Sequence, residues 1–175
     1  VVGAGGAGFP MHVKLGAKNI DYYLVNGAEC EPLMRKDREL MTHFADEVIK
    51  GLQLAADAVN AQHRVVGLKS KHQNAVKALK AVCEPCSVDM HLMKDFYPAG
   101  DEYELVYAVT ERLIPPQGLP LDVGCVVNNC ETLYNFHRAQ QGIPVTSTFM
   151  TITGMVKNPL TTWVPIGMRV RDVLE

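Results

Sequence analysis

The sequence predicts an α/β protein with a Rossmann-like, mainly parallel sheet and helices on both of its faces. Short β-rich runs alternate with helical stretches of ten or more residues, and this alternation is typical of βαβ units. A glycine-rich hexamer, Gly3–Gly8, precedes the first clear strand. After about residue 146 the alternation gives way to two successive strand-like runs. We therefore predict two domains, an α/β domain over residues 1–146 and the beginning of a second domain over 147–175.

The first half of the chain supplies two βα pairs. Val1 and Val2 read as the end of a strand that leads into the glycines, and Tyr22–Asn26 is a short apolar strand. A single helix is predicted from Asp37 to Asn60, followed by a strand over Arg64–Lys69 and a helix over Lys71–Val82. The long helix carries apolar residues at steps of three and four, which form one stripe: Met41, Phe44, Val48, Leu52, Ala55 and Val59.

The second half continues the alternation. Val88–Leu92 alternates apolar and polar residues, as a strand does. A turn at Tyr97–Gly100 leads to a helix whose expected core-facing residues are Leu105, Val106, Val109 and Leu113. The prolines and glycine of Leu113–Asp122 indicate a loop. Cys125–Val127 is an apolar strand, and Glu131–Gln141 is a helix that Gly142 can terminate.

The last segment has a different character. Val145–Thr153 is a long β run, residues 157–159 form a turn, and Thr161–Val164 is a second strand. Val170–Glu175 reads as a helix that stops before it is finished. Since the start at Val1 also interrupts an element, we expect the chain to be part of a longer protein.

Composition excludes several classes of protein. Of the 175 residues, 47% are apolar and 21% are charged, which is ordinary for globular proteins. No run approaches the ~20 apolar residues of a membrane span, and no secretory signal opens the chain. The net charge of −2 gives no reason to expect a nucleic-acid partner. The odd number of cysteines, five, indicates free thiols in a reducing compartment, so we expect a cytoplasmic protein.

The hexamer Gly3–Gly8 satisfies the pattern G-x-G-x-x-G. Glycines let backbone N–H groups approach a phosphate or a flat ring without an intervening Cβ. The pattern alone also fits a plain flexible loop. A standard dinucleotide site requires an acidic residue ~20 positions later, for which Glu29 and Glu31 are available, and a helix directly after the last glycine. Phe9 and Pro10 follow instead, so the loop departs from that standard site.

Four blocks of the chain together resemble a known family. These are Gly3–Pro10 with Lys14, Asn26–Pro32 with Asp37, Tyr97–Glu102, and Val127–Leu133. Their residues, order and spacing are similar to those of the flavin-bearing, NADH-oxidising subunit of respiratory complex I. Its relatives include the C subunit of the Rnf complex and the cobalamin-reducing flavoprotein of propanediol utilisation. The later residues Gly154–Pro159 and Val164–Gly167 are similar to the β-grasp (soluble-ligand-binding-like) domain that follows in these proteins.

The resemblance implies that the chain binds FMN. The glycines match those along the isoalloxazine and phosphate, and Lys14 is expected near the phosphate. The implied cofactor residues are Gly3, Gly5, Gly6, Lys14, Asn26, Glu29, Gly100, Asp101, Glu102, Asn128, Asn129 and Thr132. For NADH as substrate the implied residues are Phe9 and Glu31. Independently of the family, Asn129 can cap the helix from Glu131, whose N-terminal N–H groups then favour an anion.

Two departures from the complex I pattern concern the nucleotide. Ala28 stands where that pattern has an aspartate, and Ala17 stands where it has an aromatic residue that helps to stack the adenine. Together with the Tyr97–Glu102 block, they point to the Rnf-type and cobalamin-reductase-type branch. The aromatic lost at Ala17 also predicts weaker NADH binding than in complex I itself.

The expected function is an electron-transfer module of an oxidoreductase. FMN takes a hydride from NAD(P)H and passes electrons to 4Fe-4S clusters elsewhere in the full-length protein, with other subunits of an electron-transfer complex as partners. No catalytic side chain is required, because the protein positions the cofactor and tunes it. The alternative is a redox-inactive docking module with a vestigial flavin site. The final electron acceptor and the choice between NADH and NADPH stay open.

Some conspicuous residues have simpler interpretations. Cys83 and Cys86 form C-x-x-C at the end of a predicted helix, whereas a redox-active pair is expected at a helix start. A structural zinc site needs four ligands, so no metal is predicted. Cys125 and Cys130 read as buried small residues. Glu29 and Glu31 can also be read as a solvated turn.

Overall fold

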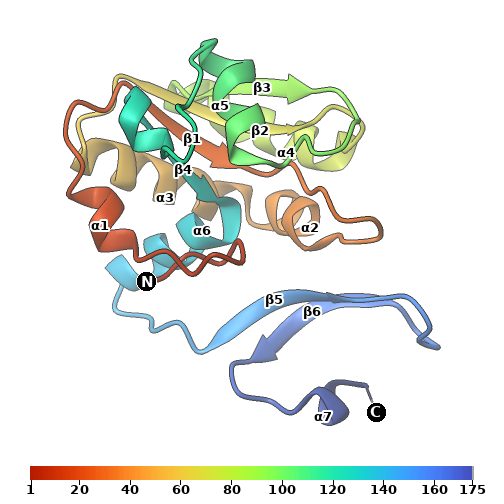
Figure 1. Ribbon diagram of the computed structural model, residues 1–175. Coiled ribbons are helices and arrows are strands. Elements are labelled where there is room, and N and C mark those ends of the chain that lie inside the picture. The colour runs from red at the N-terminus through yellow and green to blue at the C-terminus, as the bar shows by residue number, and fades with distance from the viewer. Residues whose placement is uncertain (175) are drawn as a thin grey trace.

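Residues 1–174, which the computed structural model of the chain describes, contain a four-stranded sheet in the order β3–β2–β1–β4 and a separate two-stranded sheet (Figure 1). All pairs in the larger sheet are parallel. The predicted α/β class with a parallel sheet is therefore confirmed. The helices and strands are α1 (Met11–Leu15), β1 (Tyr22–Asn26), α2 (Lys36–His43), α3 (Ala45–Ala58), β2 (His63–Lys69), α4 (Gln73–Cys83), β3 (Asp89–Met93), α5 (Glu102–Thr110), β4 (Cys125–Asn129), α6 (Cys130–Gln140), β5 (Ser147–Ile152), β6 (Leu160–Pro165) and α7 (Val170–Leu174). Short 3-10 turns span Glu84–Cys86 and Pro120–Val123.

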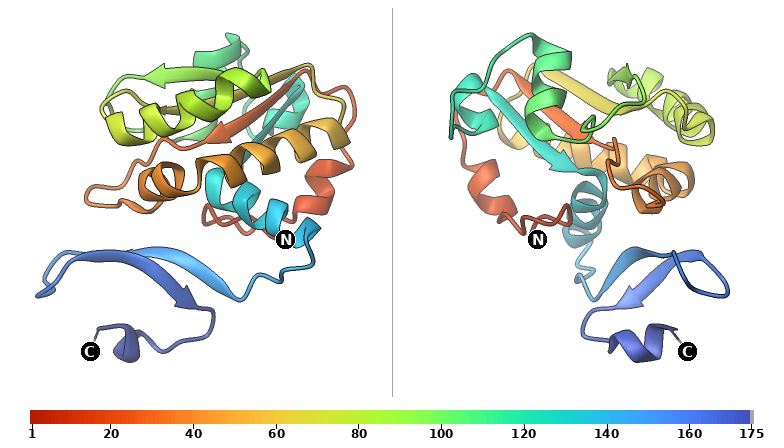
Figure 2. Two further views of the ribbon diagram at one scale, coloured as in Figure 1. Left: turned by 180° about the vertical axis from the view of Figure 1, so that it is seen from behind. Right: turned by 45° about the vertical axis from the view of Figure 1, so that its right-hand side comes forward.

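The parallel sheet is buried on both faces. On β1, Tyr23 and Val25 belong to the larger core cluster with residues of α3, α4 and α6, whereas Leu24 belongs to a second cluster with α5. Successive side chains of a strand point to opposite faces, and Val126 and Val127 of β4 divide in the same way. Figure 2 shows α5 alone on its side of the sheet, opposite α3 and α6.

The strand order places a topological switch beside β1. The chain moves from β1 through β2 to the β3 edge, then returns by α5 to β4 on the other side of β1. In open parallel sheets, ligands bind at the carboxyl ends of the strands that flank such a switch. In the register of the pair, Val25 lies opposite Asn128 and Asn26 lies opposite Asn129. Two of the predicted blocks therefore meet at this point.

Three sequence predictions need correction. The predicted helix from Asp37 to Asn60 is two helices, because Phe44 has a non-helical backbone (φ −130°) between α2 and α3. The Phe44 side chain packs edge-on against Tyr134 at 5.2 Å between ring centroids, which accounts for an apolar residue at the break. Leu113 does not face the core; α5 ends at Thr110, and Leu113 is 77% exposed. Val2 forms only an isolated antiparallel bridge with Pro10, not the end of a strand.

The smaller sheet is an antiparallel hairpin of β5 and β6. It lies on the far side of α2 and α6 from the parallel sheet, with α7 beyond it (Figures 1 and 2). Its contact with the rest of the chain is centred on Trp163, which stacks on Tyr134 at 5.3 Å between ring centroids. The placement of a domain boundary near residue 146 stays a prediction.

Within residues 1–174, every helix is too short or too polar to cross a membrane.

Candidate functional site

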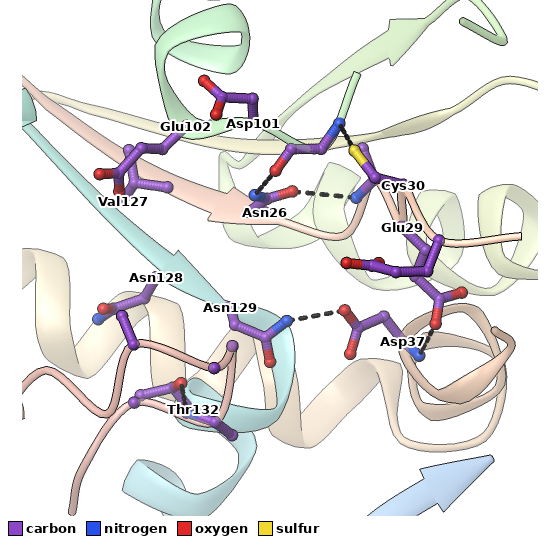
Figure 3. A pocket seen from close by; sticks show the side chains of 18 of the residues that line it. Asn26, Glu29, Cys30, Asp37, Asp101, Glu102, Val127, Asn128, Asn129 and Thr132 are labelled. Carbon is purple, nitrogen blue, oxygen red and sulfur yellow. Dashed lines mark hydrogen bonds between the residues drawn. The ribbon is translucent and has the colours of Figure 1, made fainter. Parts of the chain in front are cut away.

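A large cleft opens at the carboxyl ends of β1 and β4, where the strand order reverses (Figure 3). Its volume of about 710 Å³ lies within the roughly 300–1,000 Å³ typical of small-molecule and cofactor sites. All four blocks recognised in the sequence contribute to its wall. Every residue predicted for the cofactor or the nucleotide lines it: Gly3, Gly5, Gly6, Phe9, Lys14, Asn26, Glu29, Glu31, Gly100, Asp101, Glu102, Asn128, Asn129 and Thr132.

The glycine loop is closed on itself and docked on the start of α6. The Gly3 N–H donates to the Phe9 carbonyl at 2.9 Å, and the Ala4 N–H donates to the Thr132 hydroxyl at 2.9 Å. A Cβ added to Gly5 would lie 3.1 Å from the Asn129 Cβ, so a larger residue would fit only if Asn129 moved aside. Gly6 has a φ of +101° and no atom within 4 Å of the position of its missing Cβ. The loop therefore presents open backbone to the cleft.

The two asparagines that end β4, Asn128 and Asn129, make different hydrogen bonds. Asn129 caps α6, because its Oδ1 accepts from the Glu131 N–H at 3.0 Å, as the sequence predicted. Its Nδ2 donates to Asp37 at 2.7 Å across the cleft wall (Figure 3). The Asn128 amide instead donates inward, to the Tyr23 hydroxyl at 2.7 Å. Asn128 thus anchors the strand end, while the N-terminus of α6 faces the cleft with its positive dipole.

On the wall opposite the glycine loop, the turn after β1 and the turn at Tyr97–Gly100 are joined by hydrogen bonds at Gly100. The Asn26 Nδ2 donates to the Gly100 carbonyl at 2.8 Å, and the Gly100 N–H donates to the Cys30 Sγ at 2.8 Å (Figure 3). A Cβ on Gly100 would lie only 1.8 Å from the Ala28 carbonyl oxygen. Next to it, Asp101 caps α5 by accepting from the Tyr103 N–H at 2.8 Å. These contacts fix the acidic pair Asp101 and Glu102 at the rim.

The first turn of α2 closes the cleft between these walls. The Glu29 carboxylate accepts from the Asp37 N–H at 3.0 Å, and more distantly from the Arg38 N–H at 3.4 Å, and so takes the place of a missing N-cap. Glu29 is 8% exposed, which rules out a solvated turn for this residue, whereas Glu31 is exposed. Burial raises the pKa of Glu29, although the hydrogen bond from Asp37 opposes the shift.

Lys14 reaches the cleft from α1. Its ammonium donates to the Val127 carbonyl, at the entry to the Asn128–Thr132 turn, and lies 5.4 Å from the centre of the Phe9 ring. Burial lowers the pKa of Lys14, and the neighbouring Glu102 partly offsets that shift. The lysine is therefore held at the glycine-loop end of the cleft, where a phosphate is expected.

The charges of the cleft are unevenly distributed. The glycine loop and the start of α6, with Asn129 and Thr132, form one wall, whereas Glu29, Asp101 and Glu102 lie on the other walls (Figure 3). The charged side chains that line it are Lys14, Lys36, Glu29, Glu31, Asp37, Asp101 and Glu102. Such a site can hold an anionic group at the glycine-loop end and a polar ring or sugar along the carboxylates.

Sequence reasoning missed several lining residues. Lys36 and Asp37 form a buried ion pair at 2.6 Å and line the cleft together with Met34, Cys30 and Tyr97. Asp37 was part of a recognised block without an assigned role. Lys36 gave no signal, because a lysine at a helix start normally faces water.

Ala17 lies outside the cleft. It lines a separate hollow formed by residues 15–21 and 58–62, at the other end of α1, and packs against the core. The prediction that Ala17 weakens nucleotide stacking stays a prediction.

Of the five cysteines, only Cys30 lines the cleft. Cys83 is the last residue of α4 and is buried, and burial raises the pKa of its thiol to about 12, which disfavours a reactive thiolate. Cys125 and Cys130 are fully buried, as predicted. Within residues 1–174 no three His, Cys, Asp or Glu side chains are grouped so that they could hold a metal ion.

Comparison with known proteins places this geometry in context. The family of the Nuo51 FMN-binding domain matches residues 1–138. The chain is 47% identical over 175 residues to the cobalamin reductase PduS of Citrobacter freundii, covering 99% of this chain and 38% of that protein. It is 36% identical to the C subunit of the Na(+)-translocating ferredoxin:NAD(+) oxidoreductase complex of Acetobacterium woodii, covering 100% of this chain and 41% of that protein.

A solved structure extends the likeness to three dimensions. The air-oxidised NAD+-reducing [NiFe]-hydrogenase contains a chain that superposes with a TM-score of 0.83 at 26% identity, over 99% of this chain and 36% of that one. Like the curated relatives, it is much longer than this chain, which spans about two fifths of their length or less.

Proposed function

The chain belongs to the Nuo51 FMN-binding domain family, and from this we propose that it holds FMN in the cleft as part of an electron-transfer oxidoreductase. One observation carries the proposal. Four blocks that are far apart in the sequence line a single cleft, in which an open glycine loop is docked on a capped helix start. A flat ring with a terminal phosphate fits this arrangement, because the loop offers backbone without Cβ atoms and α6 offers its positive end.

Different residues of the cleft would bind the phosphate and the ring of FMN. The start of α6 and Lys14 would hold the phosphate, since both supply positive charge at one end of the cleft. Gly3, Gly5 and Gly6 would lie along the ring. Asn26 is held by Gly100 and Ala28, which use one donor hydrogen and one acceptor lone pair of its amide, so one of each remains for the ligand.

When bound, FMN would supply the chemistry, accepting a hydride from NAD(P)H and releasing electrons singly. This chain's part is to bind, orient and exclude water. Phe9 and Glu31 stand at the exposed side of the cleft, where a nucleotide can approach. Phe9 would offer an apolar face, and Glu31 would accept from ribose hydroxyls.

The onward path of the electrons lies in other parts of the protein. We propose 4Fe-4S clusters there as acceptors and other subunits of an electron-transfer complex as partners, at the cytoplasmic side. The names of the relatives, a cobalamin reductase and a ferredoxin:NAD(+) oxidoreductase subunit, support this role. The alternative, a redox-inactive docking module, predicts a colourless protein that does not take up flavin.

Titration with FMN and riboflavin tests the proposed site. FMN should bind more tightly, because only FMN carries a phosphate for Lys14 and α6. Lys14→Ala should weaken FMN by roughly 1.5–3 kcal/mol and leave riboflavin almost unchanged, as expected for a hydrogen bond to a charged group. Equal affinity of the wild type for the two flavins would contradict the proposed phosphate site.

Anaerobic addition of NADH tests the hydride route. Excess NADH should bleach the flavin band of the FMN-loaded protein, and Phe9→Ala and Glu31→Gln should slow the bleaching. A flavin that dithionite reduces, but saturating NADH and NADPH do not, would contradict direct hydride transfer in this cleft.

A further inference from the structure

A buried carboxylate of the cleft-bearing unit accepts two hydrogen bonds from the hairpin. Glu131, in the first turn of α6, is 1% exposed. Its Oε1 accepts from the Thr148 hydroxyl and from the Phe149 N–H of β5, both at 2.9 Å. Its Oε2 pairs with the Lys36 ammonium at 2.9 Å. A single side chain thus connects the hairpin to the first turn of α2.

The hairpin contacts both ends of α2. At the N-terminal end, the Arg35 N–H donates to the Thr151 hydroxyl of β5 at 3.1 Å, next to Lys36. At the C-terminal end, Trp163 of β6 packs edge-on against Phe44 at 6.1 Å between ring centroids. Short helices are held mainly by tertiary packing. The hairpin therefore adds support at both ends of α2, whose Leu40 and Met41 are buried in the core.

The first turn of α2 is also part of the cleft. Lys36 and Asp37 line it, and Asp37 accepts the Asn129 amide at 2.7 Å while its N–H is bound by Glu29. Burial by itself lowers the pKa of Lys36, but the carboxylates of Asp37 and Glu131 outweigh it and raise the pKa. Lys36 therefore stays charged. Removing either carboxylate leaves a buried charge with an incomplete set of partners, which is costly.

We propose that the hairpin β5–β6 supports the FMN cleft, with Glu131 as the positioning residue that joins the hairpin to the Lys36–Asp37 turn. The inference rests on the proposed function. Docking of the hairpin then raises the affinity for FMN. By thermodynamic linkage, bound FMN raises the equilibrium constant for docking of the hairpin by the same factor.

The test uses hairpin-side and helix-side variants of the whole chain. Glu131→Gln removes the charge that Lys36 needs, and should weaken FMN about tenfold, within the usual range of coupling between sites. Thr148→Val lies outside the cleft lining and removes only one donor to Glu131, so it should weaken FMN about threefold. Because both act through Glu131, the double variant should bind FMN about as weakly as Glu131→Gln alone.

Two further measurements follow the hairpin directly. Trp163 is the only tryptophan of the chain, and its emission without flavin reports whether the hairpin is docked on Tyr134. Lys36→Met, a change on α2, should shift that emission to longer wavelength. In the wild type, FMN should slow hydrogen exchange of the Phe149 amide about fivefold. This effect should be lost in Glu131→Gln.

The matched control is Thr162→Val. Thr162 lies on β6, and its hydroxyl makes no hydrogen bond with any of residues 1–174, so FMN affinity should stay within about twofold of the wild type. Wild-type affinity in Thr148→Val, or Phe149 exchange that FMN leaves unchanged, would overturn the support role. A wild type that binds no FMN would overturn the proposed function instead. In that case, Trp163 emission that Lys36→Met leaves unaltered would separately overturn the structural link between α2 and the hairpin.

Discussion

The α/β unit and the hairpin differ in how they are held together. In β1, the consecutive residues Tyr23, Leu24 and Val25 have no exposed surface, because helices cover both faces of the sheet. In β5 and β6, only Phe149 and Val164 are buried. A two-stranded hairpin is at best marginally stable in water. The hairpin therefore depends on its contact with the α/β unit, whereas the sheet around β1 carries its own core on both faces.

The contacts inside each region are also of different kinds. In the α/β unit, α3 and α6 approach so closely that backbone touches backbone. The hairpin is docked by the rings around Trp163 and by a few polar contacts through Glu131 and Thr151. Backbone contacts cannot adjust to added atoms, whereas peripheral side-chain contacts can be lost one at a time. Changes in the α/β unit should thus affect the stability of the whole chain, whereas changes in the hairpin should leave the folding of the sheet around β1 intact and reach only the cleft that the hairpin supports.

The largest effect is expected from Gly51→Ala in α3. A Cβ at Gly51 would lie 2.0 Å from the Leu133 carbonyl oxygen of α6, so the two helices must separate. We expect a net loss of about 2–3 kcal/mol in the free energy of unfolding, because overpacking outweighs the better helix propensity of alanine. Urea unfolding followed by circular dichroism and by Trp163 emission should give one common, lowered transition.

Gly16→Ala is the matched control. The nearest atom to its added Cβ is at 3.5 Å, an ordinary contact, and its backbone is right-handed, so stability should change little. If Gly51→Ala lowered only the Trp163 transition, the α/β unit would not be the self-sufficient region that the comparison describes.

The next effect is expected from Trp163→Ala in β6. Trp163 contacts the rings of Phe44, Tyr134 and Phe149, and each aromatic pair contributes roughly 0.5–1.5 kcal/mol beyond its buried area. We expect a loss of about 2 kcal/mol that is confined to the hairpin. Hydrogen exchange should become faster in β5 and β6 and stay slow in β1 and β4. Met155→Ala, at a fully exposed position, should change neither.

A smaller, pH-dependent effect is expected from Glu29→Gln at the cleft. Burial raises the pKa of Glu29 above its ordinary value of 4.5, so the folded protein favours the protonated carboxyl. The contribution of the protonated Glu29 to the free energy of unfolding is fully present below pH 4.5, and it is lost as pH rises through the raised pKa. The stability of the wild type relative to Glu29→Gln should therefore fall with rising pH. A flat difference between pH 4 and 8 would show that Glu29 is not buried as described.

The fold of the α/β unit could be predicted because its signals are local. Runs such as Tyr22–Asn26 and Arg64–Lys69 are apolar, and the helices between them show clear periodicity. The break at Phe44 could not be predicted, because Phe44 continues the apolar stripe of the helix. Its cause is a contact with Tyr134 and Trp163, which are distant in sequence. Leu113 was misplaced for a related reason, since periodicity does not show where a helix ends.

The cleft could be predicted as a set of residues but not as a set of contacts. The resemblance brought together blocks that the strand order indeed places side by side, at Asn26 and Asn129. It did not reveal that Asn128 turns inward to Tyr23 or that Glu29 caps α2. Lys36 was missed altogether, because its second ion-pair partner, Glu131, is distant in sequence and reaches it only in the folded chain.

The smallest effect on stability is expected from Thr151→Val, which tests the polar contact of Thr151 apart from those of Glu131. The Thr151 hydroxyl accepts from the exposed Arg35 N–H and shares a hydrogen bond with the Thr161 hydroxyl, and water can replace it toward both when it is removed. Valine suits a strand as well as threonine does. We expect a loss of about 0.5 kcal/mol, at the lower end of the range for a hydrogen bond. Exchange of the hairpin amides should rise by about twofold, and β1 should be unaffected. A loss as large as that of Trp163→Ala would show that the hairpin is docked mainly at the first turn of α2 rather than by its aromatic cluster.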